Sequence, residues 1–134
     1  MKIVLDTSVL ISESVRDDLG TPMTVASITY AELRFGASRP GLSGAERAIR
    51  ELRLRRIMAQ FGGGLPFDDA AAVSYGTLTA LVEGAGRQVR GRRFDLLIAA
   101  VAHANGAGIV TENGGELAAL KAVMPVLTPV GVSW

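Results

Sequence analysis

The stretch that decides the fold is KIVLDTSVLI, residues 2–11, in which one carboxylate, Asp6, separates two apolar runs. Lys2 to Leu5 predicts a buried strand, and the following residues predict a helix over Thr7–Glu13. Asp6 then has two interpretations. It can cap the helix, or it can stand at the carboxyl end of a parallel strand, where open α/β sheets place their ligands. The second interpretation requires other acids that converge on it.

Strand-like runs alternate with helical patterns along the rest of the chain. Further strands are predicted at 23–26, 108–111 and 126–127, and further helices at 28–36, 44–62, 68–84, 94–105 and about 115–123. This alternation favours an α/β fold with a central parallel sheet flanked by helices. The glycine run at 62–64 lacks the context of a phosphate loop and is interpreted as a helix stop and turn. The helices on either side of it are expected to form a hairpin.

Composition narrows the class of protein. The 134 residues, 49% of them hydrophobic, predict one domain over residues 1–134. The chain has no cysteine, so any metal must bind oxygen ligands or the single histidine, His103. No apolar run approaches the roughly 20 residues that span a bilayer, which predicts a cytoplasmic protein without membrane contact.

The basic residues are almost all arginine. Twelve of the 14 are Arg, with seven between Arg34 and Arg56 and four between Arg87 and Arg93. The planar guanidinium suits phosphates as well as carboxylates. These clusters therefore indicate either a nucleic-acid surface or an ordinary solvated face or protein interface.

The helix predicted from SITYAELRFGAS (27–38) carries an acid among its apolar residues. Ile28, Ala31, Glu32 and Phe35 stand at i, i+3, i+4 and i+7, which predicts that they share one buried face. A buried carboxylate needs a partner, a raised pKa or a metal. An arginine partner would make Glu32 structural, whereas a metal would make it functional.

The segment RRFDLLIAAVAHANG (92–106) repeats this anomaly. Residues 96–102 are all apolar and predict a central buried helix, yet Asp95 lies in its first turn. The helix dipole favours an anion there by about 0.3–1 kcal/mol, which suits a cap or a metal ligand. His103, near the end of this helix, is interpreted as a packed or exposed polar residue rather than a ligand.

The segment GIVTENGGEL supplies the remaining polar candidates. Thr111, Glu112, Asn113 and Glu116 all lie near the carboxyl end of the strand predicted at 108–111. Any of them can cap the helix that follows, and only one or two can face a site.

Asp6, Glu32 and Asp95 are thus expected at one edge of the sheet, with Asn113 or Glu116 joining them. Like charges brought together repel unless a cation neutralises them, and an all-oxygen set of ligands suits Mg²⁺ or Mn²⁺. Such a metal keeps positions open for water and phosphate. Metal-assisted phosphodiester hydrolysis is the reaction that this arrangement favours.

Four motifs in this order and spacing resemble a PIN-domain ribonuclease of the VapC toxin family. They are IVLDTSVLI (3–11), SITYAELRFG (27–36), FDLLIAAVAHANG (94–106) and IVTENGGEL (109–117), with LPFDDAAAVSYGTL (65–78) between them. The resemblance implies a PIN-like α/β/α sandwich and a Mg²⁺- or Mn²⁺-dependent endoribonuclease that cleaves RNA. It also implies a homodimer and a VapB-like antitoxin that binds the toxin in a hetero-oligomer.

The resemblance also implies roles for the acids. Asp6 and Asp95 match the most regular metal ligands of the family, and Glu32 matches its third acid. The family often has an acid or an Asn in the segment that corresponds to TENGGEL, and here Asn113 and Glu116 both remain open. The predicted catalytic residues are therefore Asp6, Glu32, Asp95 and Glu116, and the predicted metal ligands are Asp6, Asp95, Glu32 and Asn113.

Hydroxyl groups complete the implied site. Thr7 and Thr111 resemble hydroxyls that order the site in such proteins, and Ser8 has a similar but weaker claim. The chain departs from the family pattern at Leu117, where an aromatic residue is usual. This departure bears on the geometry of the fourth site residue, which is Asn113 or Glu116.

Two other classes of function remain as alternatives. A phosphotransfer domain would use Asp6 as the phosphoacceptor, but it needs a second acid nearby, and Ser8 stands at the i+2 position. A PIN-like module without catalytic activity would bind RNA or protein only. Binding without metal-dependent cleavage would favour this second alternative.

Overall fold

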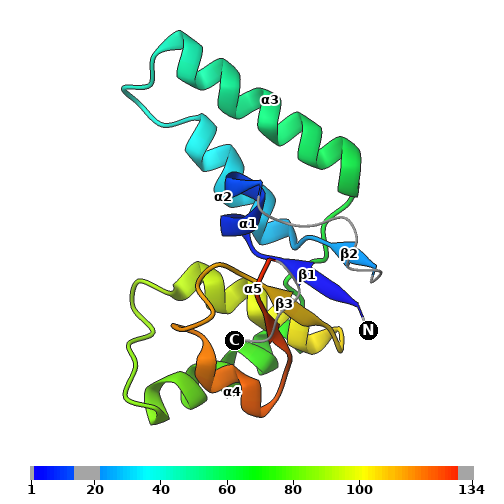
Figure 1. Ribbon diagram of the computed structural model, residues 1–134, viewed down its shortest axis with the longest axis vertical. Helices are drawn as coiled ribbons and strands as arrows, with labels where there is room; N and C mark the ends of the chain where they lie inside the picture. The colour runs from blue at the N-terminus through cyan, green and yellow to red at the C-terminus, as the bar shows by residue number, and fades with distance from the viewer. Residues whose placement is uncertain (1, 14–21, 130–134) are drawn as a thin grey trace.

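The computed structural model describes residues 2–13 and 22–129. The elements are β1 (Ile3–Leu5), α1 (Thr7–Ser12), β2 (Met23–Thr24), α2 (Ser27–Ala37), α3 (Gly44–Phe61), α4 (Asp69–Gly84), α5 (Arg93–Ala104), β3 (Gly108–Val110), the 3₁₀ helix η2 (Ala118–Ala122) and β4 (Val126–Leu127) (Figure 1). Each predicted strand and helix has a counterpart. The last helix is shorter than predicted and is 3₁₀ rather than α.

Within the described residues, four parallel strands form one sheet in the order β2-β1-β3-β4. The chain leaves β1 toward β2 on one side and later returns to β3 on the other side. The order therefore reverses between β1 and β3, and open α/β sheets bind their ligands at such a point. Asp6 directly follows β1 and Thr111 directly follows β3, so both stand at this point.

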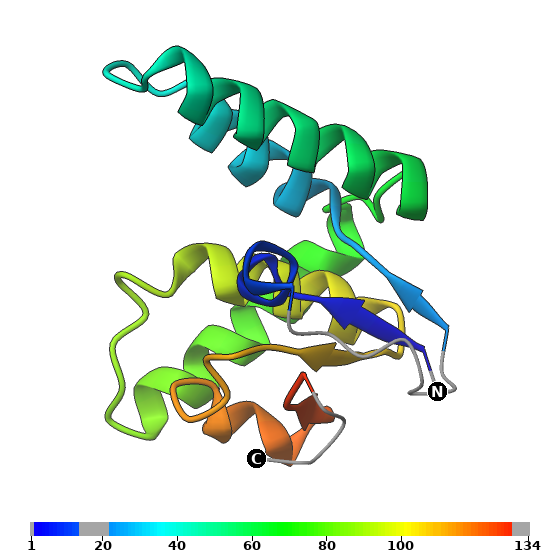
Figure 2. The same cartoon turned by 45° about the horizontal axis from the view of Figure 1, so that its top comes forward.

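Helices cover both faces of the sheet, which confirms the predicted α/β/α sandwich. Along β1, Ile3 and Leu5 pack with residues of α1, α2 and α3, whereas Val4 packs with α4 and α5. This alternation follows from the two-residue repeat of a strand. Figure 2 shows α3 lying across α2, on the side of the sheet away from η2. No helix in the described part of the chain is long and apolar enough to cross a membrane.

The glycine run after α3 makes a turn, as predicted. Gly62 caps α3 with a φ of 71°, and a Cβ on Gly64 would come within 2.7 Å of the Ser27 nitrogen. Leu65 then accepts a hydrogen bond from the Ser27 N–H at 2.8 Å and donates one to the Val25 carbonyl at 2.9 Å. This pairing takes the chain around the edge of the sheet. The predicted hairpin is therefore wrong, because α3 packs on α2 and α4 packs on α5.

The buried face of α2 also differs from the prediction. In α2 the buried residues are Thr29, Leu33 and Ala37, while Phe35 is 70% exposed and Glu32 is half-buried at the margin. The buried face is thus rotated relative to the predicted one. In α3 only Leu54 and Ile57 are buried, and three large apolar residues stay exposed (Ile49, Leu52 and Met58). These helices leave apolar surface uncovered because α3 contacts the body of the protein along one narrow stripe.

Candidate functional site

Asp6 is fully buried at the junction between β1 and α1, and both of its predicted roles meet there. Its Oδ1 accepts a hydrogen bond from the Thr7 N–H at 2.9 Å, so it caps α1. Its Oδ2 accepts from the Ser8 hydroxyl at 2.9 Å and from the Thr111 hydroxyl at 2.8 Å. Thr111 comes from the neighbouring strand and ties the two sides of the switch point together. A carboxylate has about four acceptor positions, so these three bonds leave room for one more partner.

Glu32 reaches the same place from α2. The Thr7 hydroxyl donates to Glu32 Oε1 at 2.7 Å, which links the first residue of α1 to the third acid. Among the described residues, no basic side chain forms an ion pair with Glu32 or Asp6. The described residues therefore do not support the alternative in which an arginine neutralises Glu32.

Asp95 lies in the first turn of α5, where it is half-buried. Asn113 donates from Nδ2 to Asp95 Oδ2 at 3.4 Å, a long bond that brings the segment after β3 against α5. The helix positions Asp95 because its apolar residues are buried on all sides, Leu96, Ile98 and Ala99 among them. The side chain at position 95 is thereby fixed at the end of a rigid core element.

The pKa values of all three acids are raised. Burial is the largest cause for each, and it raises the pKa of Asp6 and of Glu32 above their ordinary values. The charge of Asp6 raises the pKa of Glu32 further. Burial and then the charges of Asp6 and Glu32 raise the pKa of Asp95 to about 6, against the opposing effects of Arg92 and Asn113. For Asp95 the charge of Arg92 is thus too weak to offset burial and the two neighbouring acids.

A divalent ion suits this donor set, although the side chains do not form a complete cage. Within residues 2–13 and 22–129, no three His, Cys, Asp or Glu side chains stand close enough together to hold an ion. Mg²⁺ in nucleotide-processing sites commonly takes only one or two carboxylates, with water and substrate phosphate filling its other positions. The oxygen-only chemistry, the open acceptor position on Asp6 and the absence of a basic partner among these residues all fit such an ion.

The two remaining acids after β3 have different environments. Glu116 forms ion pairs with Arg92 at 3.3 Å and with Arg87 at 3.5 Å, so its carboxylate faces the loop before α5. Glu112 was one of the polar candidates after this strand but was given no role in the site, yet its charge raises the pKa of Asp6, and its backbone N–H donates to the Ser8 hydroxyl at 3.3 Å. Only its position directly after Thr111 could have indicated this.

His103 lies away from these acids. Its Nδ1 is 2.7 Å from the Ser74 hydroxyl, between α5 and α4. The interpretation of His103 as a packed polar residue is confirmed.

A cavity of about 570 Å³ opens beside the acids. Glu32, Asp95 and Asn113 line it together with residues 90–94. Its volume lies within the roughly 300–1,000 Å³ of small-ligand sites. Residues 90–94, called here the arginine wall, thus bring three arginines into the same cavity as two carboxylates, and this combination suits a substrate that carries phosphate.

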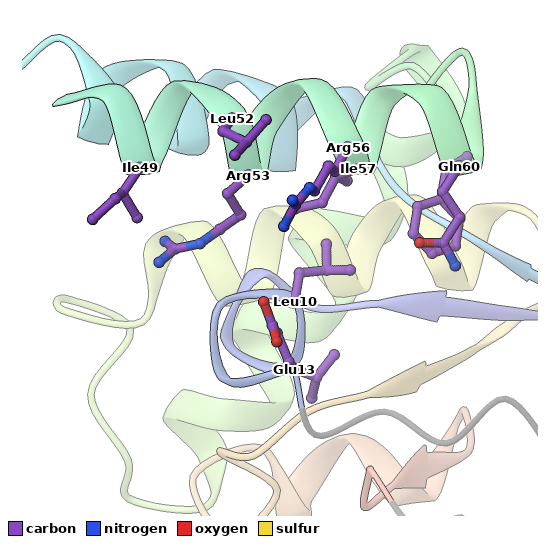
Figure 3. Close-up of a pocket in the computed structure, with 10 residues that line it drawn as sticks. Leu10, Glu13, Ile49, Leu52, Arg53, Arg56, Ile57 and Gln60 are labelled. Carbon is purple, nitrogen blue, oxygen red and sulfur yellow. The ribbon is translucent and has the colours of Figure 1, made fainter. Parts of the chain in front are cut away.

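A second cavity, of about 540 Å³, lies between α1 and α3. Figure 3 shows α3 side chains, among them Ile49, Leu52 and Arg53, above Leu10 of α1 and Glu13, which caps α1. The groove is apolar along its floor and has charged groups at its rim. Arg53 also lines a smaller cavity that includes Glu32, so the groove continues toward the acids.

Known proteins resemble this chain along nearly its whole length. The family model described as "PIN domain" matches residues 3–122. A structure of VapBC-5, a member of the VapBC family of toxin-antitoxin systems from Mycobacterium tuberculosis, is 33% identical with a TM-score of 0.77, over 98% of both chains. DNA-bound VapBC from Salmonella typhimurium is 26% identical with a TM-score of 0.75, over 96% of this chain and 98% of that one. FitAcB from Neisseria gonorrhoeae is 28% identical with a TM-score of 0.72, over 95% and 97%.

No curated protein sequence matches the chain. The family match spans nine-tenths of the residues, and the structural likeness covers the same elements that hold the acids. The chain belongs to the PIN domain family, as a VapC-type member.

Proposed function

We propose that this protein is the toxin of a toxin–antitoxin pair and acts as a divalent-metal-dependent endoribonuclease. The observation that carries the proposal is the convergence of Asp6, Glu32 and Asp95 on the switch point of the sheet, where burial raises the pKa of each and the charge of Asp6 raises those of Glu32 and Asp95 further. Acids held in this state without a basic partner favour a bound cation.

The roles of the residues follow from their contacts. Asp6 and Asp95 would hold Mg²⁺ or Mn²⁺, and Glu32 and Asn113 would complete the site. When bound, the ion lowers the pKa of a coordinated water and offsets charge on the scissile phosphate. Thr7 and Thr111 keep the carboxylates in place through their hydroxyls. Attack of water in line with the leaving oxygen would yield a 5′-phosphate and a 3′-hydroxyl.

Glu116, in contrast, pairs with arginines of the segment before α5. Its two ion pairs occupy both carboxylate oxygens, Oε1 with Arg92 and Oε2 with Arg87. We therefore assign the fourth position beside the metal to Asn113, and to Glu116 the task of orienting Arg92 next to it. Rotation of the Asn113 amide would present its oxygen to the ion, since the amide group carries both a donor and an acceptor.

The experiment is cleavage of total cellular RNA by purified protein with Mg²⁺, Mn²⁺ or EDTA. The parent is compared with Asp6→Asn and Asp95→Asn, and with Asp69→Asn as a control acid on the surface of α4. We expect discrete metal-dependent fragments with 5′-phosphates from the parent and the control, and none from the two site variants. Cleavage by Asp6→Asn at the parental rate would refute the assignment. RNA binding without cleavage would favour a non-catalytic PIN-like module.

The α1–α3 groove supports a protein partner for the same toxin. The VapBC structures that resemble this chain belong to toxin–antitoxin systems. We propose that this protein also has a VapB-like antitoxin and that the two act in the cytoplasm. Their hetero-oligomer would contain a homodimer of the toxin. An amphipathic antitoxin helix would bury Leu52 and meet Arg53 and Arg56 with acids. Leu52→Glu is expected to abolish inhibition by the antitoxin while RNA cleavage stays at the parental rate.

A further inference from the structure

Phe94 is an exposed aromatic residue in the wall of the cavity that holds Asp95. Its side chain is 51% exposed, although its neighbours further along α5 are buried in the core. It lines the same cavity as Glu32, Asp95 and Asn113. A bulky apolar side chain in this position contacts whatever enters the cavity.

The ring of Phe94 is free to accept a stacking partner. Among the described residues, no other aromatic ring or guanidinium lies over it. Phe35 on α2 provides the contrast, because it is 70% exposed but carries the Arg39 guanidinium 5.9 Å from its ring centre. Phe35 also lies outside the lining of the cavity at the acids.

Arginines surround Phe94 on the same wall. Arg90, Arg92 and Arg93 all line the cavity. Glu116 holds Arg92 at 3.3 Å, while Arg90 and Arg93 are exposed and form no ion pair within the described residues. Guanidinium groups bind phosphate through paired N–H donors. The wall therefore offers one apolar ring face between groups that bind phosphate.

We propose that this wall binds one unpaired nucleotide of a single-stranded RNA, with its base stacked on Phe94 and its flanking phosphates on Arg90 and Arg93. The proposal deepens the proposed ribonuclease function and rests on it. Aromatic side chains can stack only on bases that are splayed out of a helix. Every base has a π face, so the wall selects single strands over duplexes and is tolerant of sequence.

The first test is binding of a short single-stranded RNA that contains 2-aminopurine, measured by anisotropy and fluorescence quenching in EDTA. Stacking contributes about 1–3 kcal/mol per base, so Phe94→Ala is expected to weaken binding about 5- to 150-fold and to relieve the quenching. Phe94→Trp is expected to retain both signals, and Phe35→Ala serves as the matched control. Affinity for a blunt RNA duplex should not change in Phe94→Ala.

The second test addresses the phosphates through salt dependence. For single strands the slope of log affinity against log salt falls by about 0.7 for each phosphate that the protein no longer neutralises. Arg93→Gln is expected to show this decrease, whereas Arg55→Gln, on a separate surface between α2 and α3, is expected to keep the parental slope.

The outcomes separate this inference from the proposed function. Cleavage of single-stranded RNA by Phe94→Ala should show a raised KM with kcat unchanged, because stacking contributes equally to substrate and transition state. If the parent cleaves RNA but Phe94→Ala binds and quenches like the parent, the inference alone fails. Equal losses in Phe94→Ala and Phe35→Ala, or no binding by the parent in EDTA, also overturn it. If the parent cleaves no RNA with either metal, the proposed function fails.

Discussion

Replacing Asp95 by Asn is expected to stabilise the metal-free protein while it abolishes cleavage. Burial and the charges of Asp6 and Glu32 raise the pKa of Asp95 from 3.8 to about 6, so the folded state holds this proton more tightly than the unfolded chain does. Stability contributed by such a group is present below the unfolded pKa and is lost as pH rises through the folded value. At neutral pH the ionised Asp95 is therefore a cost to folding, which an amide avoids.

The magnitude can be worked from the same values. A tenfold change in proton affinity corresponds to about 1.36 kcal/mol, so a rise from 3.8 to about 6 sets a ceiling of about 3 kcal/mol. Because Asp95 is only half-buried, solvent screening reduces this to about 1–2 kcal/mol. The variant also loses about 0.3–1 kcal/mol of favourable interaction with the α5 dipole. A net gain of about 1 kcal/mol remains, or about 3–5 °C in Tm.

The assay is urea and thermal unfolding in EDTA between pH 4 and pH 8. The advantage of Asp95→Asn should be absent near pH 4, grow through pH 6 and level off above pH 7. Asp69→Asn is the control, because this exposed acid lies in the first turn of α4 and only the dipole contribution is lost. Mg²⁺ should raise the Tm of the parent and leave that of Asp95→Asn unchanged. A variant less stable than the parent at pH 7.5 in EDTA would refute the reasoning.

Three further variants test single contacts. Thr111→Val removes the 2.8 Å hydrogen bond to Asp6, and such a bond to a charged acceptor is worth about 1.5–3 kcal/mol. Cleavage at limiting Mg²⁺ should therefore fall about 10- to 100-fold. Thr111→Ser keeps the hydroxyl and should stay near the parent. Gly64→Ala places a Cβ within 2.7 Å of the α2 backbone and should cost about 1–3 kcal/mol in urea unfolding, whereas Gly63→Ala, with nothing within 4 Å, should not. Glu116→Gln releases Arg87 and Arg92, and Arg92 can then neutralise Asp95. Half-maximal cleavage should therefore need severalfold more Mg²⁺, and an unchanged requirement would argue against this role.

The sequence was sufficient for the elements that are decided locally. The alternation of strands and helices predicted the parallel sheet. Asp6 could be selected as a candidate site residue because it is a lone acid between two apolar runs. Asp95 was identifiable for the same reason, since all the residues after it up to Ala102 are apolar. For both acids, the apolar neighbours in the sequence predict a position at the core, and the fold places Asp6 and Asp95 there.

The predictions that were wrong, and the contacts that were not predicted, depend on segments that are distant in the sequence. The buried face of α2 could not be predicted from spacing, because Phe35 and Ala31 fit an apolar stripe that faces solvent. The pairing of α3 with α2 follows from a turn that depends on Gly64 lying against α2. The ion pairs of Glu116 join it to arginines more than 20 residues earlier, and no local pattern indicates such a pair.

The arrangement of charges explains how acids and arginines coexist at one cavity. Asp6 receives hydrogen bonds from one backbone N–H and two hydroxyls, all neutral donors, so its negative charge stays available to a cation. Arg92 stands close enough to lower the pKa of Asp95, yet its guanidinium pairs with Glu116. Without that pairing, the nearest arginine would be free to neutralise the acid directly and compete with a metal. Glu116 thus holds Arg92 away from full pairing with Asp95, which leaves the acids of the cavity suited to a cation while Arg90 and Arg93 suit phosphate, as the proposed hydrolysis of RNA would require.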